Sequence, residues 1–385
     1  MNPLREVHEQ AQAEFQPYAD VEIVSTFGEP QAEYAAIRKG CALMDLPQRG
    51  ILEVTGTGRL EFLNNYLTNE VWNKEKKAGL QPGQGVYAFL LNNKGRIVSD
   101  MNVLELPGDR TLLEMDARMV ETVRAGLDRY LFNAKVALTS KVGSLHEIAL
   151  HGPRALDVLN QILDAPIQPI QPLQPLQPLA ASRTQLLDVE VVIWRDDPAS
   201  VPGYHLILPT ESARKIWMTL ISRFAQPDTV GKRQLRPTGW AAFNATRIEG
   251  GRPLFGIDFD DSVLPAETGD VTLARAVSFT KGCYLGQEIV ARMHARGQVA
   301  RQIVGLKLDN DALPIAGAHV FDDQQNQIGG ITSSTVSPVL SNVAICLGYV
   351  KKPFVAEGTR VKVPAEGSMR DARVTRLPFV ESISG

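Results

Sequence analysis

The stretch LLNNKGRIVSDMNVLEL, residues 90–106, contains two apolar segments separated by Asn92-Asn93-Lys94-Gly95. Asn and Gly adopt the backbone angles that tight turns require, so this stretch predicts a β-hairpin. Alternating or helix-spaced apolar residues also occur around it, at residues 51–55, 58–68, 111–116, 120–130, 136–139 and 146–150. The resulting order of strands and helices indicates an α+β unit of ferredoxin-like type.

Length and composition limit what the protein does. The chain has 385 residues, 44% of them hydrophobic, and 40 basic against 43 acidic residues. Two or three domains are expected at this length, and the near-neutral balance argues against direct binding of nucleic acid through a broad basic surface. The cysteines, Cys41, Cys283 and Cys346, form no CxxC pair, so neither a disulfide framework nor a zinc site is expected. No leader or membrane-spanning stretch is recognisable, which predicts a cytoplasmic protein without membrane partners.

The chain changes character at two places. Residues 165–179 read APIQPIQPLQPLQPL, which fits an extended polyproline-II linker or, alternatively, a ligand for a proline-recognising module. Short strands punctuated by Gly, Pro and Asp begin near residue 298 and predict a small β-barrel. We therefore expect one region at 1–299, with the Gln-Pro linker inside it, and a barrel domain at 300–385. Residues 185–194 read as a single strand.

The octet KGCYLGQE, residues 281–288, is the sharpest local motif. Gly282 and Gly286 bracket Cys283, and a helix is expected to begin at Gln287. A thiol close to a helix N-terminus, with Lys281 and Arg292 nearby in sequence, has its thiolate form favoured. The alternative is that Cys283 is a small buried apolar residue, as free cysteines often are.

Two further features carry chemistry. Asp100 follows the hairpin turn and either accepts hydrogen bonds from a ligand in a cleft or is a solvated acid at a strand edge. Arg247, in the segment RIEGGRP, either clamps a carboxylate or forms an internal ion pair that closes a helix end. The six histidines have no metal-ligand spacing, so no metal site is predicted.

Several strings resemble, in this order, the folate-binding family that contains the glycine-cleavage T-protein and the YgfZ-type iron–sulfur cluster factors. They are YAAIRKGCALMD at 34–45, ILEVTGTGRLEFLNNYLTNEV at 51–71, the hairpin at 90–106, HGPRALDVL at 151–159, RIEGGRPLFGID at 247–258, SPVLSNVAICLGYV at 337–350 and LPFV at 377–380. The octet KGCYLGQE resembles the signature of the YgfZ-type branch. Together they cover nearly the whole chain.

The resemblance implies a ring of two interlaced α+β folate-binding subdomains with ferredoxin-like or Greek-key sheets, plus a C-terminal β-barrel, around a tetrahydrofolate channel. In the T-protein branch two adjacent acids stand on the hairpin, where this chain has Ser99-Asp100, and a folate-contacting Glu stands where this chain has Val201. In the helix motif, Phe243 and Asn244 replace Arg and Asp. These departures count against aminomethyl transfer.

The resemblance therefore implies a tetrahydrofolate-binding factor, not a conventional enzyme, that assists assembly or repair of iron–sulfur proteins, its partners. Cys283 and Asp100 would be its working residues, and Asp100, Arg247 and Glu249 would bind tetrahydrofolate or a one-carbon-substituted folate. The motif loop would consist of Lys281, Gly282, Cys283, Tyr284, Gly286, Gln287, Glu288 and Arg292. The alternative is a folate-dependent aminomethyltransferase or demethylase.

Overall fold

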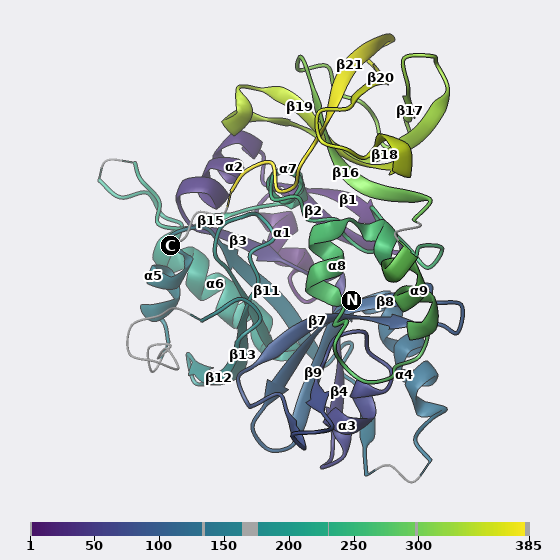
Figure 1. Ribbon diagram of the computed structural model, residues 1–385. Helices are drawn as coiled ribbons and strands as arrows, with labels where there is room; N and C mark the ends of the chain where they lie inside the picture. Colours follow the sequence, from purple (N-terminus) through teal and green to yellow (C-terminus); the bar gives the residue numbers. More distant parts are fainter. Residues whose placement is uncertain (1, 133–134, 164–175, 230, 297–298, 382–385) are drawn as a thin grey trace.

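The computed structural model describes residues 2–132, 135–163, 176–229, 231–296 and 299–381 (Figure 1). The Gln-Pro run predicted as a linker lies outside these residues except for its last four positions. None of the helices within these ranges is long and apolar enough to cross a membrane.

Two β-sheets form the centre of the molecule. The five-stranded sheet has the order β10 (Ala137–Ser140), β4 (Arg49–Thr55), β9 (Arg110–Asp116), β8 (Ile97–Leu106) and β7 (Gly85–Leu91), and every pair in it is antiparallel. The six-stranded sheet has the order β12 (Ala181–Leu186), β13 (Val189–Arg195), β14 (Gly203–Pro209), β11 (Leu145–His151), β3 (Ala42–Asp45) and β15 (Arg236–Pro237). The predicted hairpin is the pair β7 and β8.

Helices cover the outer face of each sheet. On the five-stranded sheet, α3 (Arg59–Asn64) and α4 (Val120–Asp128) bury Leu63 and Val123 against strand residues such as Leu113. On the six-stranded sheet, α5 (Ala155–Asn160) and α6 (Ala213–Phe224) cover a larger cluster that includes Trp217 and Leu206. The inner faces of both sheets share a third cluster, in which Leu104 and Leu106 meet Val192 and Ile207. The order helix, sheet, sheet, helix buries apolar side chains on both faces of both sheets.

The chain passes between the sheets more than once. Strand β3 belongs to the six-stranded sheet, the next long strand β4 belongs to the five-stranded sheet, and the chain returns with β11. The two subdomains are therefore interlaced, as expected. The N-terminal part adds α1 (Arg5–Gln10), the hairpin β1 (Glu14–Tyr18) with β2 (Val21–Thr26), and α2 (Pro30–Lys39), and a short ribbon pairs β5 (Trp72–Asn73) with β6 (Ala78–Gly79).

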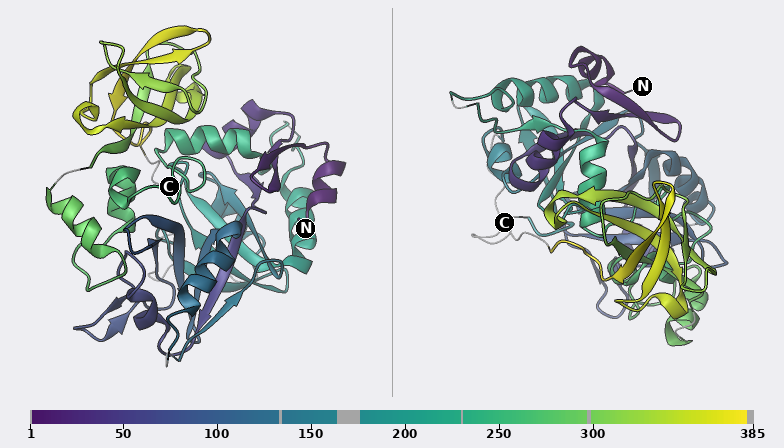
Figure 2. Two further views of the ribbon diagram at one scale, coloured as in Figure 1. Left: turned by 90° about the vertical axis from the view of Figure 1, so that its right-hand side faces the viewer. Right: turned by 90° about the horizontal axis from the view of Figure 1, so that it is seen from above.

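The C-terminal part is a closed six-stranded barrel, which confirms that prediction (Figures 1 and 2). Its strands follow the order β16 (Arg301–Leu308), β19 (Val343–Lys351), β18 (Gln327–Ser337), β17 (His319–Phe321), β20 (Arg360–Ala365) and β21 (Ser368–Thr375). Cys346 and Val361 lie in its interior. Before it come α7 (Trp240–Glu249), α8 (Asp270–Ala276) and α9 (Gln287–Arg296).

The prediction of one strand over residues 185–194 is wrong. The chain turns at Leu187 and Asp188, whose φ angles are 53° and 62°, and strands β12 and β13 pair on either side of them. Two consecutive residues with positive φ produce the tight turn that matches strand twist. Leu is not a residue that announces such a turn, so the sequence gives no signal for it.

Candidate functional site

Side-chain alternation along β8 opens a cavity between the two sheets. Met101 and Val103 point to the helix-covered face of the five-stranded sheet. Leu104 and Leu106 point inward and pack against the six-stranded sheet. The inward positions at the other end of the strand are polar, namely Asp100 and Asn102, and both line a cavity of about 100 Å³. The same face of one strand therefore contributes both to the apolar core and to a polar pocket.

The six-stranded sheet closes the pocket from the opposite side. Trp194 on β13 and His205 on β14 alternate with residues of the outer core and face inward, as does His151 on β11. The remaining walls come from strands β1, β4, β7 and β9, from helices α7 and α8, and from the loops after β3, β13 and α7. They are Tyr18, Leu46, Gln48, Arg49, Tyr87, Glu114, Asp196, Pro198, Trp240, Phe243, Arg252, Pro253, Leu254, Phe255 and Arg275.

Asp100 is the most distinctive acid of the pocket. Its side chain is buried, and its Oδ2 accepts a hydrogen bond of 2.8 Å from the Tyr87 hydroxyl. Among the residues that the structure describes, none donates a hydrogen bond to its Oδ1. Burial raises the pKa of Asp100 to about 6, although the nearby Arg49 guanidinium favours the charged form. A carboxyl group that titrates near neutrality and keeps one oxygen free is suited to accept a proton or a hydrogen bond from a ligand.

The neighbouring Ser99 does not face this cavity. It is fully buried, has the same strand parity as Met101, and its hydroxyl donates to the carbonyl of Asp100 at 2.9 Å. An acid at position 99 would therefore point away from the pocket. Val201 is likewise buried in an apolar cluster with Ala199 and Phe243. The presence of Ser instead of an acid at position 99 therefore does not change the face of β8 that lines the pocket.

Two arginines share one carboxylate on the wall of the pocket. The guanidinium groups of Arg252 and Arg275 lie 3.1 Å and 3.0 Å from Asp196 Oδ1. Arg275 also lies over the ring of Tyr87, 4.3 Å from its centroid. This part of the wall carries one positive charge more than Asp196 neutralises, so it favours an anionic group on a ligand.

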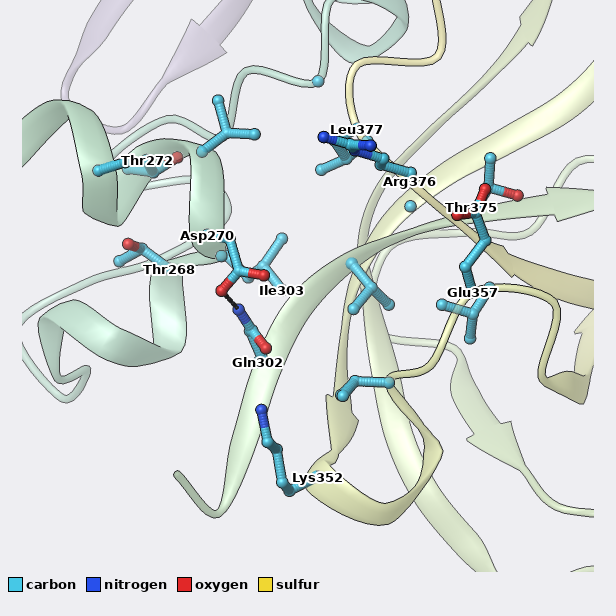
Figure 3. Close-up of a pocket in the computed structure, with 18 residues that line it drawn as sticks. Thr268, Asp270, Thr272, Gln302, Ile303, Lys352, Glu357, Thr375, Arg376 and Leu377 are labelled. Carbon is cyan, nitrogen blue, oxygen red and sulfur yellow. Dashed lines mark hydrogen bonds between the residues drawn. The ribbon is translucent and has the colours of Figure 1, made fainter. Parts of the chain in front are cut away.

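A second cavity is larger but lacks such features. It has a volume of about 560 Å³ and lies between α8 and the barrel (Figure 3). In this cavity the Gln302 amide Nε2 donates a hydrogen bond of 2.5 Å to Asp270 Oδ1, and Arg376 and Lys352 are among the residues that line it. None of the described residues that line it has a buried polar atom without a partner, whereas Asp100, His151, Trp194 and His205 in the first cavity all do. Buried unpaired polar atoms mark the smaller pocket as the candidate site.

The structure does not bring Arg247 and Glu249 into this pocket. Arg247 is fully buried and pairs with Asp258 at 2.5 Å, where it also donates to Ser333 of the barrel. Glu249 accepts hydrogen bonds from Tyr34 and from the guanidinium of Arg38, and it is also fully buried. These contacts join α7 to the barrel and to α2, so the internal ion pair is the arrangement found.

The octet loop is held in place by contacts of its own polar and glycine residues. The Lys281 ammonium donates to three backbone carbonyls, those of Asn64, Leu67 and Asn69, at 2.6–3.0 Å. Burial lowers the pKa of Lys281 to about 7, while the three carbonyl oxygens stabilise the charged form. Lys281 therefore anchors the loop to the end of α3.

Gly286 supplies the close contact between this loop and the hairpin turn. Its φ is +82°, and a Cβ there would lie 2.7 Å from the carbonyl oxygen of Asn92. At Gly282 neither a positive φ nor a close neighbour requires glycine. Gln287 accepts a hydrogen bond from the backbone N–H of Tyr284, at 3.1 Å. The loop thus packs against the turn that leads into β8.

Two other members of the octet, Cys283 and Glu288, are exposed, and so is Arg292 further along α9. Tyr284 is half-buried and packs against a core cluster. The expected support of the thiolate by Lys281 is not found, because the ammonium is held by three carbonyls. Cys283 does not line the pocket that contains Asp100.

We predict that Cys283 reacts with a thiol reagent in the folded protein, whereas Cys41 and Cys346 do not. The latter two are buried, and burial raises the pKa of Cys346 to about 12 and that of Cys41 further. Intact mass after treatment with iodoacetamide should show one adduct in buffer and three in denaturant. Cys283→Ser should show none in buffer, and an adduct on that variant would contradict the assignment.

We also predict that Lys281→Met loosens the octet loop without unfolding the protein. Three carbonyls at the end of α3 lose their shared donor, while the cores of the sheets and barrel keep their contacts. Limited proteolysis should cut near residues 278–296 faster than in the wild type. Lys362→Met, whose ion pair with Asp371 is exposed, is the matched control and should leave the rate unchanged. Equal rates for both variants would show that Lys281 does not anchor the loop.

Sequence reasoning named only Asp100 among the residues of the pocket. The others come from strands and loops up to 175 positions away, and no local motif connects them. One signal was available: Glu114 and His205, two residues of the pocket, stand next to apolar residues in strands that are buried on both faces. A buried strand that carries a polar residue on its inner face indicates a site.

Comparison with known proteins gives matches over the full chain. The GCVT N-terminal domain matches residues 4–281, and the glycine cleavage T-protein C-terminal barrel domain matches residues 301–381. Aminomethyltransferase from Chloroherpeton thalassium is 27% identical over 98% of both chains, and a probable aminomethyltransferase from Natronomonas pharaonis is 28% identical over 98% of both. The crystal structure of the glycine cleavage system aminomethyltransferase T from Bartonella henselae has a TM-score of 0.84 and 26% identity, covering 99% of this chain and 98% of that one.

These matches contradict the prediction of an iron–sulfur cluster factor. The full-length relatives carry the name aminomethyltransferase, and nothing in the matches supports the YgfZ-type branch or iron–sulfur partners. The physical reason for the error lies in the octet, where Lys281, Gly286 and Gln287 make contacts that position a loop. The sequence pattern suggests a reactive thiol, whereas in the structure these three residues hold the loop against α3 and the hairpin turn.

Proposed function

Because the chain belongs to the family of the glycine cleavage T-protein, with its N-terminal domain and C-terminal barrel, we propose that it is a folate-dependent transferase of aminomethyl groups. Tetrahydrofolate is the one-carbon acceptor in this family. The substrate would bind in the pocket between the two sheets, and Asp100 would accept a proton or a hydrogen bond from the folate amine. The observation that carries this proposal is the buried Asp100 carboxyl with one free oxygen.

The chemistry of the pocket is compatible with a reduced folate. Aromatic side chains, among them Tyr87, Trp194 and Trp240, offer faces on which a flat heterocycle can stack. Asp100 offers an acceptor for ring N–H groups. The excess positive charge of Arg252 and Arg275 over Asp196 suits the carboxylates of the folate tail.

The pocket is too small to admit a folate without movement of its side chains. Its volume of about 100 Å³ is smaller than the roughly 300–1,000 Å³ of most small-molecule sites. Admission of a folate therefore requires lining side chains to change rotamer, as is common when ligands bind. The single hydrogen bond from Tyr87 to Asp100 is one contact that a ligand would have to replace or share.

The test is direct. Isothermal titration of the purified protein with tetrahydrofolate should give saturable heat. Ammonia release from an S-aminomethyl thiol should depend on both the protein and tetrahydrofolate. Asp371→Ala, at an exposed barrel position, serves as the control and should behave as the wild type. Saturable binding without any ammonia release would overturn the transferase proposal, and the absence of binding would remove the folate as well.

The activity should depend on pH through Asp100. A carboxyl group accepts a proton only when ionised, and burial raises the pKa of Asp100 to about 6. The ratio kcat/KM should therefore rise as the pH increases from about 5 to 7 and should level off above about pH 7. A profile that is flat between pH 5 and 7 in the wild type would contradict the role of Asp100.

A further inference from the structure

His205 faces the pocket from the sheet opposite Asp100, and its partner Glu147 is not among the residues that line the pocket. His205 on β14 and Glu147 on the adjacent strand β11 are joined by a hydrogen bond of 2.7 Å between Nδ1 and Oε1. His205 is only 9% exposed, and it stacks on Trp194 at a centroid distance of 4.3 Å. Its ring is thus fixed on two sides, by a carboxylate at one nitrogen and by an aromatic face.

The second ring nitrogen of His205 is the notable atom. Its Nε2 is buried and has no hydrogen-bond partner in the described part of the chain, and the residue lines the same cavity as Asp100. The Glu147 carboxylate accepts from Nδ1–H, so Nε2 is the nitrogen left to gain or lose a proton. A buried polar atom without a partner is costly in a folded protein and indicates a role toward a ligand.

The charged groups around the pair come from several strands. Burial raises the pKa of Glu147, Glu114 acts in the same direction, and the His205 imidazole and Arg49 oppose them. His151 packs edge-on to His205 at 5.4 Å, and burial together with His205 lowers the pKa of His151 to about 3, so His151 stays neutral. The groups that face His205 are thus Glu147 and His151 on β11, with Arg49, Glu114 and Asp196 beyond them.

We propose that His205 is the second acid–base residue of the pocket and that Glu147 is its positioning residue. The proposal rests on the transferase function given above. Asp100 serves the folate amine from one sheet, and His205 Nε2 serves the departing group of the one-carbon donor from the other. Two orphaned polar atoms on opposite sheets of one cavity carry this inference.

The proton transfer balances without any further reactant. As the bond between the transferred carbon and its leaving atom breaks, the leaving group keeps the electron pair. His205, as imidazolium, gives its Nε2 proton to that group. The first folate amine forms a new carbon–nitrogen bond and loses its proton to Asp100. Ammonia leaves afterwards, when the second folate amine bonds to the same carbon. The bond from that carbon to the amino nitrogen then breaks, and the proton of the second amine passes to the departing nitrogen. Glu147 stays hydrogen-bonded to Nδ1–H and stabilises the imidazolium before it gives up its Nε2 proton.

Two substitutions of His205 test the roles of its two ring nitrogens separately. His205→Asn keeps a donor for Glu147 and removes the Nε2 position. His205→Gln keeps a hydrogen-bonding group near Nε2 that does not titrate. Both should lower kcat for ammonia release by at least about 100-fold, while the affinity for tetrahydrofolate by titration calorimetry stays as in the wild type. Wild-type turnover in either folded variant would overturn the proposal.

Glu147→Gln tests the positioning role with a readout that structural support alone would not move. Removal of the carboxylate disfavours the imidazolium, so the alkaline limb of the kcat profile should move to lower pH by about one unit or more. A lower kcat at every pH, without a shift of the alkaline limb, would show that Glu147 only supports the fold.

In ¹⁵N spectra of histidine-labelled protein, tetrahydrofolate alone should shift one imidazole signal that is missing in His205→Asn. If the same signal stays in place, His205 does not face the bound substrate.

The outcomes also separate this proposal from the function on which it rests. If the wild type neither binds tetrahydrofolate nor releases ammonia, the transferase function fails and the role of His205 fails with it. If the wild type does both and the His205 variants bind folate less but turn over normally, His205 serves recognition only and the acid–base proposal is overturned. If both variants bind and fail to turn over, the proposal is supported.

Discussion

Replacement of Asp100 by Asn is expected to lower kcat/KM for tetrahydrofolate-dependent ammonia release by about 10²–10⁴-fold. Asn keeps the size of the side chain and still accepts the hydrogen bond from Tyr87, but its amide does not take up a proton. The residual activity should also lose its rise between pH 5 and 7. Ammonia release over this pH range, for wild type and variant, is the measurement.

The stability of the same variant provides the control. Burial raises the pKa of Asp100 to about 6, so the folded state binds the proton more tightly than the unfolded chain, whose Asp has a pKa near 4. The ionised wild type therefore carries an unfavourable free energy that is full above pH 6 and disappears as the pH falls towards 4. Asp100→Asn should be more stable than the wild type at pH 8 by about 2–3 kcal/mol. A variant that is inactive and less stable at pH 8 would show that the loss of activity comes from misfolding.

Replacement of Arg247 by Met is expected to lower the free energy of unfolding by about 3–5 kcal/mol. Both Arg247 and Asp258 are fully buried in the side chain, and the variant leaves the Asp258 carboxylate without its cation. Asp258 keeps hydrogen bonds from Thr332 and Ser333 of the barrel, which do not neutralise its charge. Urea unfolding followed by circular dichroism gives the difference.

Two matched variants sharpen this result. Arg214→Met breaks an exposed pair with Glu6, whose side chains are 53% and 76% exposed, and should cost at most about 1 kcal/mol. The double variant Arg247→Met with Asp258→Asn removes the buried charge together with its partner and should recover part of the loss. Equal effects of Arg247→Met and Arg214→Met would contradict the structural role of the buried pair. Because Arg247 lies outside the pocket, its variants should bind tetrahydrofolate under conditions where they are folded.

The elements that the sequence predicts correctly are those with strong local signals. The turn at Asn92–Gly95 carries its own chemistry, and the flanking strands show their burial pattern. The barrel strands are short and separated by Gly, Pro and Asp. The hairpin between β12 and β13 was missed because Leu187, the first of its two turn residues, is of a type that rarely adopts the positive φ angle found here, although Asp188 tolerates it.

The residues of the candidate site, in contrast, are mostly not predictable from local sequence signals. Asp100 stands out in sequence, but Arg275 and His205 join it only because two sheets face each other. Conversely, in sequence Lys281 looks like a cation that favours a thiolate and Arg247 like one that clamps a carboxylate. In the structure Lys281 is bonded to three backbone carbonyls and Arg247 to Asp258. Residue type and spacing describe what a side chain can do, while its partners decide what it does.

The sequence by itself determined the α+β class, the hairpin, the C-terminal barrel and the family resemblance, because each rests on patterns that are local or that recur in order along the chain. Only the tertiary structure decided which polar residues work together. Strand alternation sends Asp100 inward and Ser99 outward, and the packing of the second sheet brings His205, which is bonded to Glu147, to face Asp100 across one cavity. Such a meeting depends on contacts between residues about 100 positions apart, which no local spacing encodes.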